Sequence, residues 1–187
     1  LAVEHAEALA GIVLTQIVRP GVPVMYGAFT SNVDMRSGSP AFGTPEYTKA
    51  ALASGQLARH IRVPFRSSNV TAANEVDAQA AYESQMALWG ALMGGAHLLE
   101  HAAGWMHGGL TASFEKLILD AEMLQMMDAF FAPLDVSTAT LAVQAIRDVG
   151  PAGHFFGAAH TMERYEHAFY TPILSNWDNH PNWLQNG

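Results

Sequence analysis

The stretch AHLLEHAAGW, residues 96–105, carries side chains that could bind a metal ion. It contains His97, Glu100 and His101 in the order H-x-x-E-H. On a helix, this spacing places two histidines one turn apart with a carboxylate beside them, as in a zinc metallopeptidase. On a strand, side chains alternate between two faces, so Glu100 would point away from the face that both histidines share. The elements around this stretch decide between the two interpretations.

Segments with helical spacing alternate with short apolar runs along the chain. The expected helices are 4–21, 44–61, 74–95 and 111–131, and the expected strands are 22–27, 62–68 and 96–105. Thr44 can cap the second helix with Pro45 at its first position, and Thr111 or Ser113 can cap the fourth. This alternation is typical of right-handed crossovers around a parallel sheet, so the predicted fold class is α/β.

In that order, residues 96–105 fall where a strand is due, directly after the helix stop at Gly94 and Gly95. A zinc site would also need a third ligand, for which Glu163 or Glu166 downstream are the candidates. We therefore favour the strand and expect no metal site.

The last third of the chain is less regular. One helix is expected over 135–150 with a cap near Ser137, and another is expected to begin near Thr161 with Glu163 as its capping-box partner. Since no linker or internal repeat is visible, residues 1–187 are treated as a single unit.

Composition limits the class of partner. Nine Lys and Arg against 17 Asp and Glu give a net charge of -8, which argues against nucleic acid or an anionic membrane as partner. The chain has no cysteine, as is common in cytoplasmic proteins, and no apolar run approaches the roughly 20 residues of a membrane span. We therefore expect a cytoplasmic protein. We also expect a piece of a longer protein, because the chain opens within a helix and without Met.

In parallel α/β folds, active sites lie at the carboxyl ends of the strands. The loops there, 28–43, 67–74 and 104–109, are rich in aromatic, amide and hydroxyl side chains. They lack the motifs of nucleotide binding and serine hydrolysis. Such a composition suits a small methylated cation that packs on rings, although Phe29 and Trp105 could also cap the end of the sheet without binding anything.

Several separated motifs resemble the trimethylamine methyltransferase family in the same order. They are DMRSGSPAFGTPEYTKA, RSSNVTAANEVDAQAAYES, HAAGWMHGGLTASFEKLILDAEM and GHFFGAAHTMERYEHAFYTPIL. The resemblance implies the C-terminal half of a (β/α)8 TIM-type barrel. It also implies methyl transfer from a methylated amine to the cobalt of a corrinoid carried by a cognate partner protein, so that no cofactor binds this chain directly.

Founding members of that family carry pyrrolysine near the strand end that resembles PFRSSN, where this chain has Ser67, Ser68 and Asn69. A quaternary ammonium can lose a methyl group without that residue, because it leaves as a neutral tertiary amine. The predicted substrate is therefore a quaternary or tertiary methylamine, such as glycine betaine or trimethylamine.

The candidate residues fall into three groups. The catalytic candidates are Ser68 and Asn69; the substrate-binding candidates are Phe29, Asp34, Arg36, Phe65, Arg66, Asp77 and Trp105; the corrinoid-facing candidates are His97, His101 and His107. Two alternatives stay open, a non-catalytic methylamine-binding module and a zinc hydrolase that uses the H-x-x-E-H stretch. A homo-oligomer is also expected, because half a barrel exposes sheet edges.

Overall fold

Helices and strands alternate from the start of the chain to α4 in the computed structural model, which describes residues 1–27 and 29–186. The elements up to α4 are α1 (Ala2–Val18), β1 (Tyr26–Gly27), α2 (Pro45–His60), β2 (Phe65–Ser68), α3 (Ala78–Met93), β3 (Leu98–Glu100), β4 (Trp105–Met106), the 3-10 helix η1 (His107–Gly109), β5 (Thr111–Ala112) and α4 (Phe114–Phe131). The short helices α5 (Thr138–Leu141), α6 (Val143–Val149), α7 (Ala159–Met162) and α8 (His180–Asn186) follow. The chain divides into two compact units, Leu1–Met123 and Leu124–Gly187.

The first unit contains a parallel sheet of order β1-β2-β3. Arg66 of β2 is in register with Gly27 of β1 and Leu98 of β3, and Ser68 is in register with Glu100. A helix connects each pair of neighbouring strands, which confirms the predicted parallel α/β arrangement. Three strands do not close a barrel, but their order is compatible with part of one.

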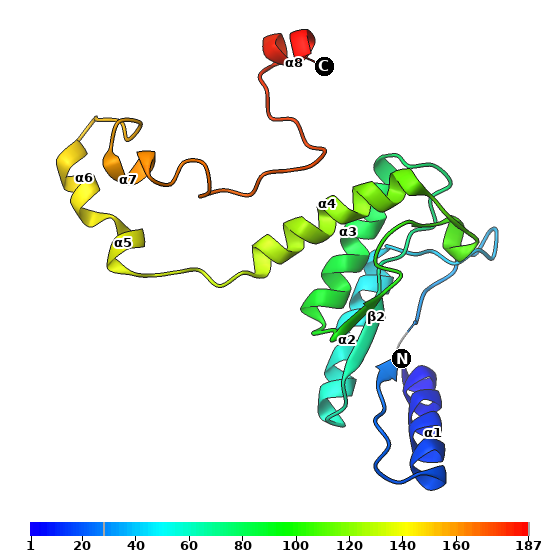
Figure 1. The fold of residues 1–187 in the computed structure, drawn as a ribbon. Helices are drawn as coiled ribbons and strands as arrows, with labels where there is room; N and C mark the ends of the chain where they lie inside the picture. The colour runs from blue at the N-terminus through cyan, green and yellow to red at the C-terminus, as the bar shows by residue number, and fades with distance from the viewer. Residues whose placement is uncertain (28, 187) are drawn as a thin grey trace. The chain divides into compact units, whose positions relative to one another are not determined.

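Helices α2 and α3 run alongside each other against β2 (Figure 1). Phe65 packs with Ala58 of α2 and with Tyr26 in a buried cluster. Side chains alternate along a strand, so Arg66 and Ser68 belong to the opposite face of the sheet. That second face carries half-exposed side chains, including Leu98, which is 44% exposed.

The helix starts follow the capping rules. At the start of α2, the Thr44 hydroxyl accepts a hydrogen bond from the Tyr47 N–H, and Pro45 lies in the first turn. Both features were predicted. Ser113, the second of the two predicted caps, accepts from the Lys116 N–H at the start of α4. Helix α3 begins four residues later than predicted, because the Asp77 carboxylate caps it.

Other predicted elements also differ from the structure. The strand over 96–105 ends at Glu100, and Trp105 begins a separate antiparallel hairpin of β4 and β5, because positive φ angles at His101 and Gly104 turn the chain. Ser137 caps a helix as predicted, but Ala142 at φ 49° divides that helix into α5 and α6.

A helix does begin near Thr161, at Ala159, but it is short and the predicted capping box is absent. Thr161 lies inside the four-residue α7, whose N-cap Ala158 has no side-chain cap, and Glu163 is at the C-cap.

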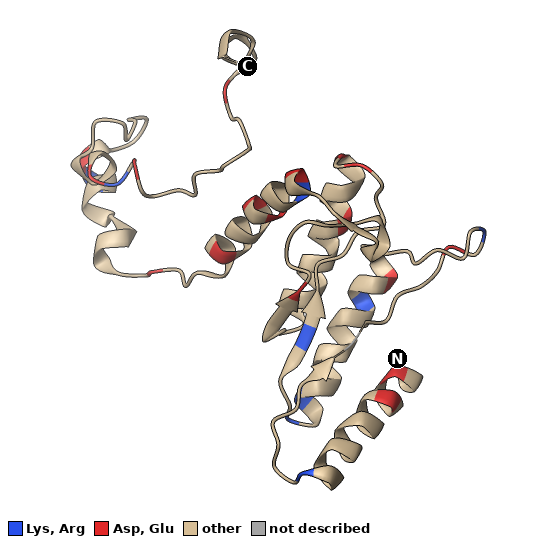
Figure 2. Ribbon diagram, turned by 45° about the vertical axis from the view of Figure 1, so that its right-hand side comes forward, with Lys and Arg blue, Asp and Glu red and all other residues tan. Residues whose placement is uncertain are grey.

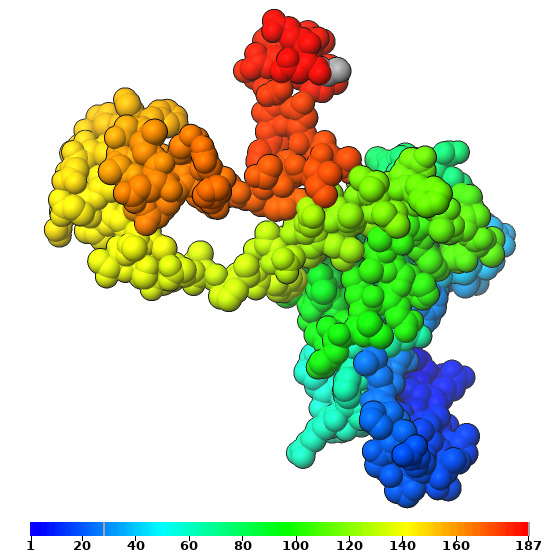
Figure 3. Space-filling model, viewed as in Figure 1, coloured from blue at the N-terminus to red at the C-terminus, as the bar shows by residue number. Residues whose placement is uncertain are grey.

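The second unit has little interior. Met127 is the only buried residue among residues 124–186. Figure 3 shows the chain after α4 in yellow to red. Its side chains are mostly exposed, including Phe156 and Phe169 at 82% each.

Charged residues are distributed thinly over the ribbon. Figure 2 shows Lys and Arg one at a time on α2, β2 and the start of α4, which agrees with the low number of basic residues. In the part of the chain that the structure describes, no helix has the length and apolar character to cross a membrane.

Candidate functional site

Aromatic side chains from three segments gather beyond the carboxyl ends of β1, β2 and β3. We call Phe29, Phe42, Tyr47, His101 and Trp105 the aromatic face. The ring centroids of Phe42 lie 5.3 Å from Phe29, 6.0 Å from Tyr47 and 5.2 Å from Trp105. The His101 ring lies 5.6 Å from Trp105 and 6.2 Å from Phe29. The structure therefore brings together Phe29 and Trp105, which were predicted, and adds Phe42 and Tyr47.

The aromatic face has a buried base and an accessible edge. Phe42 and Tyr47 are 3% and 2% exposed, whereas Phe29 is 41% exposed. Trp105 is half-buried and His101 is exposed. The three accessible rings can meet a ligand, while the two buried rings hold them in place.

The hairpin of β4 and β5 carries Trp105 at its first position. Gly109 adopts φ +97° beneath the indole, and a Cβ at this position would lie 2.6 Å from Trp105 Cζ2. Only glycine permits this close approach, so Gly109 determines how the indole packs.

His101 follows β3 with a positive φ of 53°. This turn brings its Nδ1 to 3.2 Å from Ser68 Oγ. Strand alternation predicted that Glu100 and His101 would point to opposite faces, but both reach the face of Arg66 and Ser68, because the turn ends the alternation. The prediction of opposite faces was therefore wrong.

The H-x-x-E-H stretch does not form the helix that a zinc peptidase motif needs. His97 and His101 lie at opposite ends of the extended β3, a separation of roughly 12 Å at the usual rise per residue. One zinc ion cannot bind both imidazoles at that separation, since each ligand must lie about 2 Å from the metal.

Arg66 and Glu100 form an ion pair across β2 and β3. The Arg66 Nη1 lies 2.8 Å from Glu100 Oε2, with the side chains 27% and 41% exposed. The Arg66 side chain is therefore partly accessible, with Nη1 itself buried, on the sheet face that continues toward Ser68 and the aromatic face.

Ser68 and Asn69, the two catalytic candidates, are buried at the end of β2. Asn69 Nδ2 donates to the Ala102 carbonyl at 2.9 Å, and the Tyr47 hydroxyl donates to the Ser68 carbonyl at 3.4 Å. Burial raises the pKa of Tyr47 to about 12, so its hydroxyl stays protonated at neutral pH. These contacts fix the strand end. Ser68 contacts the aromatic face at two points, through its carbonyl with Tyr47 and through its hydroxyl with His101.

The other two corrinoid-facing candidates, His97 and His107, are not part of the aromatic face. His97 Nδ1 accepts from the Phe65 N–H at 3.1 Å, at the opposite end of the strands. His107 Nε2 lies 2.9 Å from the Asn74 carbonyl and Nδ1 lies 2.9 Å from Thr111 Oγ1. Since a carbonyl only accepts, Nε2 carries the proton, and His107 joins the loops that follow β2 and β3.

Four substrate-binding candidates have other contacts. Phe65 is in the buried cluster with Tyr26, and Asp77 caps α3. Asp34 accepts from the backbone of Arg36 and from Ser37 in an exposed turn, where these hydrogen bonds lower its pKa. Arg36 is exposed in the same turn.

The model of the trimethylamine methyltransferase family matches residues 1–187. The chain belongs to this family. A glycine betaine methyltransferase of Desulfitobacterium hafniense (strain Y51) is 40% identical over 186 residues, which cover 99% of this chain and 39% of the relative. A trimethylamine methyltransferase of Methanosarcina thermophila is 29% identical over 188 residues, which cover 100% of this chain and 38% of the relative. The chain thus spans about two fifths of the length of these curated relatives.

The sequence analysis did not identify a buried carboxylate that holds one loop of the site in this family member. Glu83 of α3 is 7% exposed. Its Oε2 accepts from Thr71 Oγ1 at 2.6 Å and from the Ala72 N–H at 2.7 Å, which fixes the loop after β2. The signal in the sequence was a charged residue on the apolar side of an amphipathic helix.

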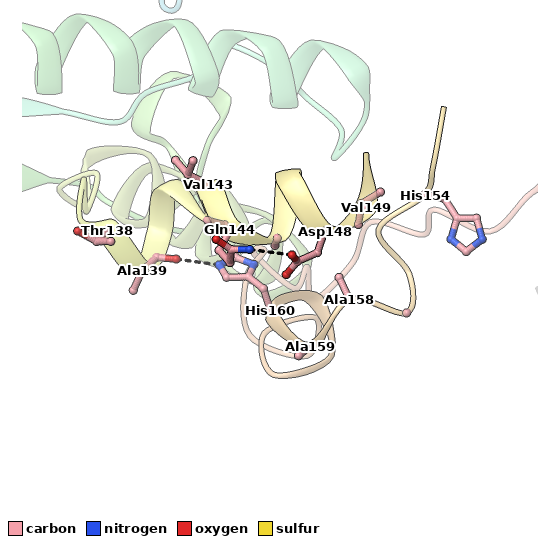
Figure 4. Close-up of a pocket in the computed structure, with 13 residues that line it drawn as sticks. Thr138, Ala139, Val143, Gln144, Asp148, Val149, His154, Ala158, Ala159 and His160 are labelled. Atoms are coloured by element: carbon pink, nitrogen blue, oxygen red, sulfur yellow. Dashed lines mark hydrogen bonds between the residues drawn. The ribbon is translucent and has the colours of Figure 1, made fainter. Parts of the chain in front are cut away.

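The second unit of this family member contains a separate concavity. A cavity of about 600 Å³ is lined by residues of α5, α6 and α7 and the turn between α6 and α7. Figure 4 shows that Gln144 and His160 lie close together there, while His154 is apart from them. Gln144 Nε2 donates to Asp148 Oδ1 at 2.7 Å and His160 Nε2 donates to the Ala139 carbonyl at 2.9 Å. These polar groups bind one another, and the remaining lining is mostly small or apolar.

Proposed function

We propose that this chain is the C-terminal part of a corrinoid-dependent methyltransferase with a (β/α)8 barrel, in which the accessible rings of the aromatic face bind a methylated amine. Membership of the trimethylamine methyltransferase family supports the class of reaction. The observation that supports the position of the amine-binding site is that Phe29, His101 and Trp105 converge at the carboxyl end of a parallel sheet.

A quaternary ammonium suits such a site. Its charge is spread over methyl groups, which pack against ring faces by cation–π attraction. When one methyl group leaves, the nitrogen keeps the bonding electron pair and departs as a neutral tertiary amine, so the protein need not supply a proton. A tertiary amine substrate would first have to be protonated or otherwise activated.

The contribution of the chain is then to bind, to orient and to exclude water. Phe29 and Trp105 would hold the cation, and Arg66 could bind a carboxylate on the same molecule. The methyl acceptor is the cobalt of a corrinoid brought by a partner protein. Accessible rings and the exposed His101 at the end of the sheet fit the approach of such a broad, flat group, and His101 would contact it there.

A methyl-transfer assay tests this function. The purified protein is mixed with its partner corrinoid protein in reduced form, and with glycine betaine or trimethylamine, and methylation of the corrinoid is followed by absorbance. Turnover with one amine is the expected result. Binding without turnover would favour the non-catalytic binding module. The absence of both binding and turnover would overturn the proposal.

The single-unit organisation over residues 1–187 and the homo-oligomer remain predictions. Strands β1 and β3 are the outer strands of the described sheet, and outer strands are usually covered. Sedimentation velocity should therefore give a species heavier than one chain.

A further inference from the structure

A buried ion pair that the proposed function does not use lies behind the hairpin of Trp105. Lys116 and Asp120 are both 0% exposed and lie one turn apart on α4. Lys116 Nζ donates to Asp120 Oδ1 and, at 2.7 Å, to Ser84 Oγ of α3. Buried ion pairs are costly to desolvate and are often no more stable than apolar residues of the same volume. A pair such as this one therefore calls for a role in specifying geometry.

The second oxygen of Asp120 binds the hairpin directly. Gly104 N–H donates to Asp120 Oδ2 at 2.8 Å, and Gly104 immediately precedes Trp105. Gly104 also has φ +83°, and its carbonyl accepts from the Ser113 N–H at 2.9 Å. The carboxylate therefore holds the residue at which the chain turns into β4.

Lys116 binds the other oxygen of that carboxylate and also contacts Ser84. One Asp120 oxygen is thus occupied by the ammonium, and the other oxygen faces Gly104. Burial lowers the pKa of Lys116, while the nearby carboxylates of Asp120 and Glu83 act to raise it.

We propose that Asp120, as the hydrogen-bond acceptor of the Gly104 N–H, is a positioning residue that sets the place of the Trp105 indole. Glu83 acts in a similar way on the loop after β2. The effect on ligand binding rests on the proposed function, whereas the effect on the indole does not.

Two double variants separate the hydrogen bond from the charge. Lys116→Met with Asp120→Asn removes the charges and keeps an acceptor for the Gly104 N–H. Lys116→Met with Asp120→Leu removes the charges and the acceptor with little change of volume. Lys116→Met with Asp120→Ala is a second acceptor-free variant in case the leucine does not fold.

The direct readout is fluorine NMR of protein labelled with fluorotryptophan. Loss of one signal in Trp105→Phe identifies the Trp105 resonance among the four tryptophans. We expect this resonance to stay in place in the asparagine variant and to shift or broaden in the acceptor-free variants. Tetramethylammonium binding by calorimetry should weaken about threefold or more in the acceptor-free variants alone, the size of a partly lost cation–π contact.

An unchanged Trp105 resonance in a folded acceptor-free variant overturns the proposal, and so does an equal shift in the asparagine variant. A shifted resonance in a protein that never binds tetramethylammonium supports the positioning role and counts against the proposed function.

Discussion

The guanidinium of Arg66 on β2 lies 2.8 Å from the carboxylate of Glu100 on β3, on the sheet face that α2 and α3 leave open. Ser68 follows Arg66 by two residues on the same face and contacts His101 of the aromatic face. Arg66 thus lies roughly 7 Å, or two strand residues, from Ser68, which contacts an accessible ring of the aromatic face. A molecule with an ammonium group and a carboxylate could contact both Arg66 and the aromatic face.

Arg66→Gln should weaken the binding of glycine betaine by roughly 10- to 100-fold, the usual range for loss of a hydrogen bond to a charged group. Tetramethylammonium has no carboxylate, and its affinity should hold or rise, because Glu100 would lose its competing cation. Titration calorimetry with both ligands makes the comparison. Arg36→Gln is the matched control, since Arg36 is exposed in a surface turn. An equal loss for both ligands in Arg66→Gln would contradict carboxylate binding by this residue.

Trp105→Ala should weaken tetramethylammonium binding by roughly 2- to 30-fold, because one cation–π contact contributes about 0.5–2 kcal/mol. Trp105→Phe keeps an aromatic face and should retain most of the affinity. Tyr82→Ala is the control, since Tyr82 lies on α3 outside the aromatic face and is 58% exposed. If Trp105→Ala binds as tightly as the unchanged protein in calorimetry, the rings do not form the cation site.

Gly55→Ala should lower the free energy of unfolding by about 1–3 kcal/mol through overpacking. A Cβ at Gly55 of α2 would lie 2.0 Å from the Gly94 carbonyl oxygen at the end of α3, so helix backbone would have to move. Gly11→Ala in α1 is the matched control, because nothing lies within 4 Å of the added Cβ. That change should raise stability by about 0.5–1 kcal/mol, the usual preference for alanine in a helix. Urea unfolding of both variants measures the difference, and two changes of the same sign would refute the packing argument.

Alkaline pH should remove the stabilisation that Tyr47 provides. The pKa of Tyr47 is raised by burial from 10.0 to about 12, so the folded protein keeps the phenol proton where the unfolded chain has lost it. This contribution is complete below pH 10 and is lost as the pH rises to about 12. The stability advantage of the unchanged protein over Tyr47→Phe should therefore fall by about 3 kcal/mol across that range, at about 1.4 kcal/mol per pH unit. Tyr26, whose pKa is also raised, is present in both proteins, so its effect cancels in the comparison. If the difference in unfolding free energy between the two proteins does not change with pH, the pKa of Tyr47 is not raised by burial.

The sequence predicted the order of elements because that information is local. Thr44 with Pro45, Ser113 and the Gly94–Gly95 pair mark helix ends through backbone hydrogen bonding within one turn. Apolar spacing then distinguished helices from strands. The family motifs quoted from the sequence were confirmed over the whole chain. Signals of this kind depend on residues a few positions apart and can be read without knowing any tertiary contact.

Only the tertiary structure decided which side chains meet. Phe65 and Arg66 are neighbours in the sequence, yet one is in the core with Tyr26 and the other forms an ion pair with Glu100. The positive φ of His101 and the hydrogen bond from Gly104 to Asp120 place the indole of Trp105. These contacts join residues from different elements, and their energies depend on burial and on distances that no spacing along the chain specifies.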